Sequence, residues 1–196
     1  MIRIAVLIDG GHLRVLTKMA KITYNTDLIE KLALACPEKD EALLRVLYYD
    51  CAPYSGKVKL PVSGKDHEFK GSDHWLKELA AKNLFAVRRG VLKFRGFKPK
   101  TVPVGSMTLS DSDFKPDFEQ KGVDMRIGLD IATFARNRAV DRIALITNDT
   151  DCVAAMKHAR ISGLQVVLIT LPNSKVAQEL LWHSDFERKI AWPALE

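Results

Sequence analysis

Carboxylates follow aliphatic runs at three separate places in this chain of 196 residues. The runs cover residues 2–8, 43–49 and 142–147, and the acids that follow them are Asp9, Asp50, Asp149 and Asp151. Short runs rich in Val, Ile and Leu are typical of strands that are covered on both faces, as in a parallel sheet. The carboxyl ends of parallel strands meet at one edge, where open α/β sheets bind ligands. These acids are therefore expected to lie near one another.

Two further acids lie in the segment "KGVDMRIGLDIATFARN", whose spacing predicts a helix near 122–138. Asp124 stands at its start, and Asp130 follows six positions later, about 120° further around a helix axis at about 100° per residue. One site could use both only if one acted from the flank, so Asp124 is the better candidate. Asp130 falls beside the apolar stripe, where a carboxylate needs a partner or a cation.

Carboxylates that converge without basic neighbours repel one another, and a divalent cation relieves that repulsion. Ligation by oxygen alone favours Mg²⁺ or Mn²⁺. Such an ion polarises a phosphoryl oxygen and lowers the pKa of bound water, which is the chemistry of phosphodiester hydrolysis. An aspartate at a strand end can instead cap the helix that follows. Both interpretations remain open for each acid taken alone.

The elements that must position these acids alternate along the chain. Strands are expected at 2–8, 43–49, 84–89, 142–147 and 165–170, and helices near 26–36, 66–82, 122–138, 151–162 and 174–183. This alternation predicts a three-layer α/β/α sandwich with a mainly parallel sheet, formed by a single domain over 1–196. Residues 90–120 are too many for a bare connection, and their "GVLKFRG" indicates an inserted hairpin or loop arm.

Positive charge is concentrated in one region. The chain has a formal charge of +6, and residues 57–100 hold twelve Lys or Arg against four Asp or Glu. Cations there alternate with Phe94 and Phe97, a pattern that can bind phosphates while stacking bases. The leading RNA contacts are Arg88, Arg89, Lys93 and Arg95. The alternative is a solvated segment whose lysines only aid solubility.

Several other classes of protein are excluded or disfavoured. The three cysteines form no CxxC, so neither a disulfide framework nor a zinc knuckle is expected. No apolar run reaches the roughly 20 residues of a membrane span, and the chain is expected to be cytoplasmic. The stretch "DGGHL" fits neither a dinucleotide nor a P-loop motif. His67 and His74 would share a helix face, but no third ligand lies near them in the sequence.

Four stretches together resemble a known family. "VLIDGGHL", "VLYYD", "KGVDMRIGLDI" and "ITNDTDCVAAMKHARISGLQVVLI" resemble, in order and spacing, the NYN domain of the LabA/DUF88 type, part of the PIN-like nuclease superfamily. The resemblance spans roughly residues 3–185. It includes "SKVAQELLWHSDFERKI", which is similar to the closing helix of that family.

The resemblance implies a metal-dependent ribonuclease on a PIN-like sandwich. The family's catalytic and metal-binding acids correspond to Asp9, Asp124 and Asp149, with Asp151 as the fourth member of the cluster, and Asp130 matches the second acid of the family's helical segment. His12, Asn148 and Asp50 are expected, with Asp130, to support these acids rather than to bind metal directly. His12 stands where the family commonly has Asn, and "TNDTDC" where it has SGDSDF. The metal site is expected to be intact, whereas substrate preference and turnover are open.

We therefore expect hydrolysis of RNA phosphodiester bonds with Mg²⁺ or Mn²⁺. Single-stranded RNA is favoured because a flexible strand enters an acidic cleft more easily than a duplex. The alternative is an RNA-binding or regulatory module with little or no activity, and a phosphohydrolase is less favoured. PIN-like proteins often pair, and the 90–120 insertion could mediate a homodimer.

Overall fold

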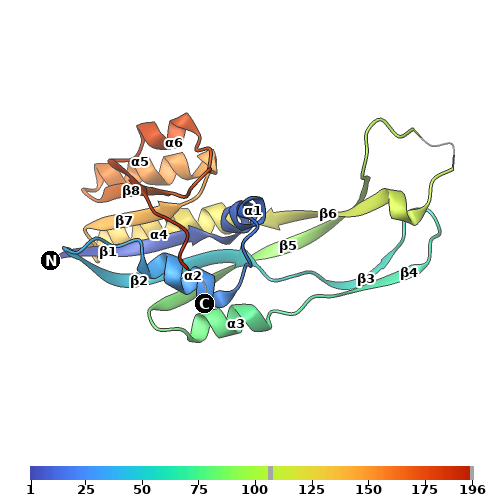
Figure 1. Ribbon diagram of the computed structural model, residues 1–196, viewed down its shortest axis with the longest axis horizontal. Coiled ribbons are helices and arrows are strands. Elements are labelled where there is room, and N and C mark those ends of the chain that lie inside the picture. The colour runs from blue at the N-terminus through green and yellow to red at the C-terminus, as the bar shows by residue number, and fades with distance from the viewer. Residues whose placement is uncertain (106–107, 195–196) are drawn as a thin grey trace.

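A seven-stranded sheet forms the centre of the computed structural model, which describes residues 1–105 and 108–194 (Figure 1). Its strands are β1 (Ile2–Asp9), β2 (Glu41–Cys51), β5 (Phe85–Pro99), β6 (Phe114–Lys121), β7 (Arg142–Ile146), β8 (Gln165–Thr170) and β9 (Phe186–Lys189). They lie in the order β6-β5-β2-β1-β7-β8-β9. All neighbours are parallel except β5 and β6, which are antiparallel. The predicted mainly parallel sheet is confirmed.

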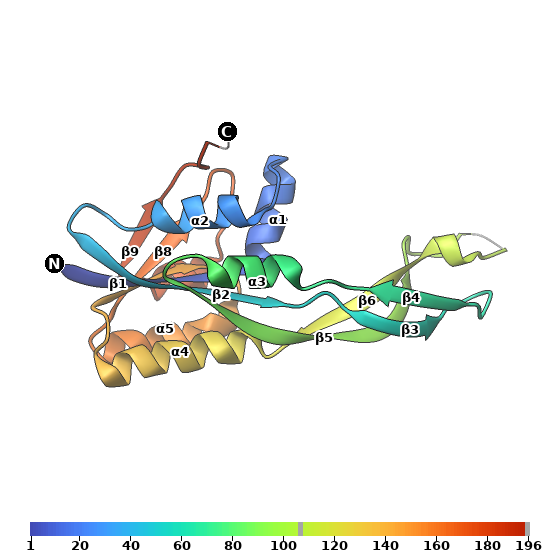
Figure 2. The same ribbon diagram turned by 90° about the horizontal axis from the view of Figure 1, so that it is seen from below.

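Helices cover both faces of this sheet, which confirms the three-layer sandwich (Figure 2). The helices on one face are α1 (Gly10–Ala20), α2 (Thr26–Leu34) and α3 (His74–Ala81), and those on the other are α4 (Val123–Asn137), α5 (Val153–Ile161) and α6 (Gln178–Trp182). Short 3₁₀ turns stand at η1 (Asp111–Asp113) and η2 (Thr150–Cys152). No helix in the described ranges is both long and apolar enough to cross a membrane.

Successive residues of each central strand contribute to opposite cores, because side chains alternate along a strand. On β1, Ala5 and Leu7 are buried against α4 and α5, whereas Val6 and Ile8 are buried against the α1–α3 layer. Each fully buried aliphatic side chain of this kind contributes about 1.5–3 kcal/mol. The same alternation continues into the acids at the strand ends, so it decides which face each acid reaches.

An arm projects from the sandwich (Figures 1 and 2). The far part of β5 pairs with β6, and a separate hairpin of β3 (Ser55–Lys59) and β4 (Asp66–Lys70) packs against that ribbon. Tyr54, Phe69, Phe94 and Phe118 join the two, with every pair of ring centroids 5.5–5.8 Å apart. The predicted hairpin insertion at 90–120 is confirmed over its described part, because residues 106–107 lie outside the description.

Three predictions about elements were wrong. The helix expected over 66–82 is strand β4 followed by the shorter helix α3, because Gly71 and Ser72 separate an alternating segment from a helical one. His67 and His74 therefore share no helix face. Helix α1 was not predicted, since its first two residues are glycines, which favour turns over helices. The closing segment expected as one helix holds only α6 and then strand β9, which extends the sheet.

Candidate active site

Asp9 and Asp149 both cap helical turns at the carboxyl edge of the sheet. Asp9 ends β1, and its Oδ1 accepts a hydrogen bond from the backbone N–H of His12 at 3.1 Å. Asp149 follows β7, and its Oδ1 accepts from the backbone N–H of Asp151 at 2.9 Å. The capping interpretation therefore holds for both residues. It uses only one oxygen of Asp149, so capping and metal binding are compatible in one side chain.

Three acids come together at this edge. Asp124, Asp149 and Asp151 each offer a carboxylate oxygen, and these oxygens all lie within 4.8 Å of one another. In the described part of the chain, none of the three carboxylates makes an ion pair. Asp9 lies beside this acidic trio, and it lines a shallow depression together with Asp149, Gly11 and His12. The structure thus brings together the four acids that the resemblance singled out.

The surroundings of Asp124 and Asp9 disfavour the charged forms of their carboxylates. Burial raises the pKa of Asp124, and the neighbouring charges of Asp149, Asp9 and Asp151 raise it further. Burial also raises the pKa of Asp9, with a smaller contribution from Asp149, although hydrogen bonds from His12, Thr147 and Gly11 oppose the change. Within residues 1–105 and 108–194, neither carboxylate forms an ion pair that would compensate its charge. An all-oxygen donor set with uncompensated negative charge fits Mg²⁺ or Mn²⁺.

Thr147 links two of the acids, and the sequence interpretation missed it. Its buried hydroxyl donates to Asp9 Oδ2 at 3.1 Å and accepts from the backbone N–H of Asp149 at the same distance. A threonine at the end of an aliphatic run looks like one more strand residue. Only the pairing of β1 with β7 brings its hydroxyl to Asp9. Thr147 therefore fixes the relative position of the two strand ends.

Asp124 reaches the cluster because β6 runs directly into α4. Gly122 turns the chain with a φ of 76°, a backbone conformation that residues other than glycine rarely adopt. Its carbonyl oxygen accepts from the guanidinium of Arg126 at 2.7 Å. Asp124 then stands in the first turn of α4, with Val123 and Ile127 buried on either side in the sequence. Gly122 thus connects strand β6 of the arm to the helix that carries Asp124.

The two polar residues that depart from the family pattern lie at the rim. His12 lines the depression, and burial lowers the pKa of its imidazole, which favours the neutral ring. Asn148 lies there too, but its Oδ1 accepts from the backbone N–H of Ala177 at 2.7 Å. Asn148 therefore ties the β7 end to the segment before α6.

Asp130 and Asp50 lie outside the acidic trio, each with a cation of its own. Asp130 accepts from Arg88 Nε at 2.8 Å and from the Tyr49 hydroxyl at 3.0 Å. Asp50 pairs with Arg14 and accepts from the Tyr48 hydroxyl at 2.9 Å. Strand alternation explains the separation, because Tyr49 faces the α4 core and Tyr48 the α1–α3 core. Asp50 therefore reaches the face opposite to that of Asp9.

The four cations predicted to contact RNA do not form one stripe. Arg88 pairs with Asp130 on the α4 side, and Arg89 pairs with Asp73 before α3. Arg95 pairs with Glu119 across the arm. Of the four, only Lys93 makes no ion pair within the described residues. Arg88 and Arg89 are adjacent in a strand, and adjacent strand residues point to opposite faces.

Basic residues do gather on the outer face of the β5–β6 ribbon, opposite the aromatic cluster. Phe94 and Phe118 point inward, so the alternating neighbours point outward. The outward residues are Lys93, Arg95, Lys98, Lys115 and Lys121 together with Asp117 and Glu119. Five cations against two carboxylates leave a net charge of +3 on this face. The ribbon carries this charge up to Gly122, where the helix with Asp124 begins.

The chain is similar to a known protein family and to a solved structure. A family model described as the NYN domain matches residues 3–186. A solved structure from Vibrio parahaemolyticus, a protein of unknown function, shares the fold with a TM-score of 0.55 and 17% identity, over 96% of this chain and 93% of that one. No curated protein matches the chain significantly. Because the family model covers nearly its whole length, the chain belongs to the NYN domain family, a family of PIN-like nucleases.

Proposed function

We propose that the protein is a divalent-metal-dependent ribonuclease that cleaves single-stranded RNA at the acidic trio. The observation that carries the proposal is the convergence of Asp124, Asp149 and Asp151, whose carboxylate oxygens lie within 4.8 Å of one another and form no ion pair with any described residue. The NYN match supports a nuclease, and hence a nucleic acid as substrate. The LabA/DUF88 subtype and a homodimer formed through the arm stay predictions.

In this proposal Asp124, Asp149 and Asp151 hold Mg²⁺ or Mn²⁺, and Asp9 lies beside them within the same site. The bound ion would supply an activated water and a polarised phosphoryl oxygen. Thr147 and the helical caps hold the carboxylates of Asp9 and Asp149 in place. The outer face of the ribbon holds the RNA backbone through its phosphates, which carry no sequence information.

The two cores share one sheet, which supports a single NYN domain over residues 1–196. The site lies where open α/β sheets bind ligands, outside the carboxyl ends of the strands. The charge pattern favours RNA cleavage over a general phosphohydrolase, because a small phosphate ester would not need a basic ribbon beside the acids.

Cleavage of end-labelled RNA tests the proposal directly. The wild type should cut single-stranded RNA when Mn²⁺ or Mg²⁺ is added and should stop when EDTA removes the metal. Asp124→Asn and Asp149→Asn should each lower the rate at least a hundredfold, because each removes a charged ligand. The matched control is Asp40→Asn, at an exposed position at the opposite edge of the sheet.

Two outcomes would contradict the proposal. If both active-site variants cut as fast as the wild type, the acidic trio is not the active site. If no preparation cuts but the wild type retains RNA in a salt-dependent way, the protein is an RNA-binding module. A matched DNA oligonucleotide in the same assay separates a ribonuclease from a general nuclease.

A further inference from the structure

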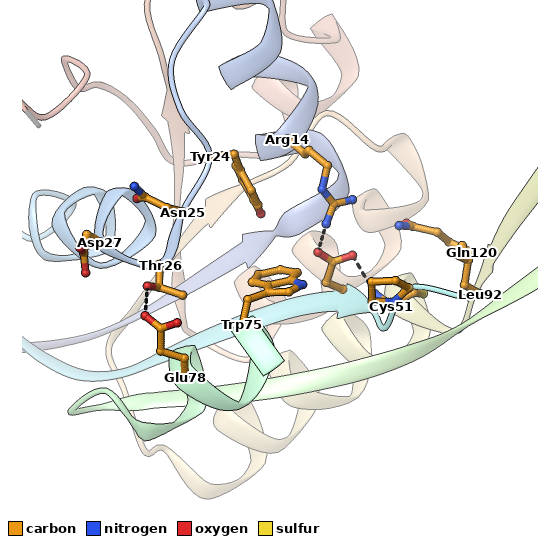
Figure 3. Close-up of a pocket in the computed structure, with 12 residues that line it drawn as sticks. Arg14, Tyr24, Asn25, Thr26, Asp27, Cys51, Trp75, Glu78, Leu92 and Gln120 are labelled. Carbon is orange, nitrogen blue, oxygen red and sulfur yellow. Dashed lines mark hydrogen bonds and ion pairs between the residues drawn. The ribbon is translucent and has the colours of Figure 1, made fainter. Parts of the chain in front are cut away.

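A pocket lies across the sheet edge from the acidic trio. It has a volume of about 620 Å³ and opens between α1, α2, α3 and the start of the arm (Figure 3). A volume of this size lies in the range of small-molecule sites, about 300–1,000 Å³. Nothing in the proposed cleavage mechanism uses it.

Aromatic and aliphatic groups form part of this pocket. Trp75 lies at its centre, with Tyr24 across from it and Leu92 to one side (Figure 3). The Tyr24 and Tyr48 rings approach Trp75 edge-on, at interplanar angles of 72° and 81°. Neither ring is stacked parallel on the indole. A flat aromatic ligand would supply the parallel partner that these neighbours do not.

Polar groups at the rim carry unused hydrogen-bonding capacity. The Gln120 amide makes no hydrogen bond within the described residues. Asn25 uses its Oδ1 to cap α2, which leaves its N–H₂ donors without a partner there. Glu78 accepts from the Thr26 hydroxyl through Oε1 alone, at 2.5 Å. Donors and acceptors thus surround an aromatic centre.

The charge of the pocket argues against a phosphate as its occupant. Its one cation, Arg14, is already paired with Asp50. Glu78 and Asp27 add two more carboxylates to the lining, although Asp27 also pairs with Lys82, which lies outside it. An anion placed here would therefore meet net negative charge, whereas an uncharged heterocycle would meet a stacking surface and hydrogen-bonding groups.

Gln120 connects the pocket to the acidic site. It lines both the pocket and the shallow depression that holds Asp9 and Asp149. A Cβ added to Gly11 would lie 3.2 Å from the Gln120 Oε1 and 3.3 Å from Asp9 Oδ1, so the amide stands directly beside the start of α1. One extended nucleotide chain could thus place a phosphate at the acids and a neighbouring base in the pocket.

We propose that this pocket binds one nucleobase of the RNA, stacked on Trp75, next to the phosphate that is cleaved. The pocket takes an uncharged base, and the acidic site takes the phosphodiester. This proposal rests on the proposed function for the identity of the polymer. Binding of the base itself does not require cleavage.

Binding of mononucleotides to the full, metal-free chain tests this proposal. The probes are the four nucleoside 5′-monophosphates, with ribose 5-phosphate as the probe that lacks a base. At least one nucleotide should quench the tryptophan fluorescence and bind in calorimetry, while ribose 5-phosphate should do neither. Trp75→Leu should weaken nucleotide binding at least about tenfold, because base stacking contributes strongly to such sites.

Two further variants separate binding from folding. Trp182→Phe is the matched control, because Trp182 is 67% exposed on α6 and outside the pocket lining. It should leave the affinity unchanged. Gln120→Ala changes an exposed side chain that makes no hydrogen bond to any described residue, so this variant should fold normally. It should weaken binding several-fold, so the proposal stays testable even if Trp75→Leu does not fold.

The results distinguish this proposal from the proposed function. Nucleotide binding that depends on Trp75, in a protein that cuts no RNA, supports the pocket and contradicts the nuclease. RNA cleavage at the acidic trio without any nucleotide binding supports the nuclease and overturns the pocket. Equal binding of ribose 5-phosphate and the nucleotides would also overturn it, because the pocket would then recognise phosphate.

Discussion

At the scale of single residues, two aspartates on helix α4, six positions apart, have different surroundings. Asp124 lies among other acids, whereas Asp130 lies between Arg88 and Tyr49. The sequence spacing favoured Asp124 and predicted that Asp130 needs a partner. It could not identify that partner, because Arg88 comes from β5 and only the sheet order brings it close.

Replacing the two aspartates should separate their roles. Asp124→Asn should remove the rise in melting temperature that Mn²⁺ causes in the wild type, whereas Asp130→Asn should preserve it. Asp130→Asn should instead cost about 1 kcal/mol of unfolding free energy, a modest loss because Arg88 is 42% exposed. Thermal unfolding with and without Mn²⁺ measures both effects. Equal metal shifts in the two variants would contradict the assignment.

The pKa of Asp124 also predicts a change without metal. Because burial and neighbouring acids raise that pKa in the folded protein, the folded state binds protons more tightly than the unfolded state. The ionised side chain therefore disfavours folding at pH values above its folded pKa, and stability should rise as pH falls through that folded pKa toward the unfolded value of 3.8. Asp124→Asn should make the metal-free protein more stable at pH 7 and remove this part of its pH dependence. Denaturant unfolding between pH 4 and 7 checks the sign.

At the scale of elements, the central strands follow directly from the sequence. The aliphatic runs that form β1, β2, β7 and β8 are apolar on both faces, so their burial does not depend on distant contacts. Strands β3 and β4 are different, since their residues are mostly exposed and their pairing depends on packing against the ribbon. The roles of Thr147 and Gln120 also depend on contacts between segments that are distant in the sequence, so these residues could not be found from the sequence alone. Their importance comes from which strand lies beside them.

A buried ion cluster connects three strands at the edge of the sheet opposite the acidic trio. Glu41 on β2 accepts from Arg142 on β7 at 2.8 Å and from Arg188 on β9 at 2.8 Å. Burial opposes ionisation of Glu41, but these hydrogen bonds and one from the backbone N–H of Glu38 outweigh it and lower the pKa of Glu41 from 4.5 to about 2. The charged form is thus strongly favoured in the folded state.

This cluster predicts a pH-dependent loss of stability. A folded pKa below the unfolded value contributes stability that is fully present above about pH 4.5 and lost as pH falls toward 2. Glu41→Gln should cost on the order of 3 kcal/mol at pH 7, and the difference from the wild type should shrink between pH 4.5 and 3. Glu179→Gln, at an exposed position on α6, is the matched control and should change little. A difference that stays constant with pH would contradict the role of the cluster.

The arm has a small core of its own, which can be weakened separately. Phe94→Ala removes a ring that contacts Tyr54, Phe69 and Phe118. Local opening of the arm should become easier by about 1–3 kcal/mol. Hydrogen exchange should therefore speed up in β3, β4 and the far part of β5 and stay unchanged in β1. Val102→Ala, 80% exposed in the arm, should leave exchange unchanged.

At the scale of the whole molecule, the positions of the charges indicate more about RNA binding than the net charge of +6 does. Several cations of the arm pair with neighbouring acids, Lys59 with Asp66, Arg95 with Glu119 and Lys98 with Asp117. A count of lysines and arginines therefore does not show which cations can meet a phosphate. On the outer face of the ribbon, Lys93 and Lys115 make no ion pair within the described residues. They are therefore the cations most available to phosphates.

Replacing both lysines should change the salt dependence of RNA binding. Each phosphate contact contributes about 0.7 to the slope of log affinity against log salt for a single strand, so Lys93→Ala with Lys115→Ala should flatten the slope by about 1.4. Lys157→Ala with Lys175→Ala removes the same charge from exposed positions outside the arm and should not flatten it. Fluorescence anisotropy with the Asp149→Asn protein avoids cleavage during the measurement. An equal change in both pairs would assign the ribbon to solubility.

The bulge in the ribbon has a consequence for how this arm can vary between relatives. The register between β5 and β6 shifts between Phe94 and Gly96, and Gly96 has a φ of 104°. Because of this shift, Phe97 pairs with Pro116 and lies on the same face of the ribbon as Phe94, with their ring centroids 5.2 Å apart. Because side chains alternate with a period of two, a single inserted residue would exchange the aromatic and basic faces beyond it unless another bulge absorbed the change. We therefore expect arm lengths in relatives to differ by even numbers of residues per strand, or by odd numbers accompanied by a glycine bulge.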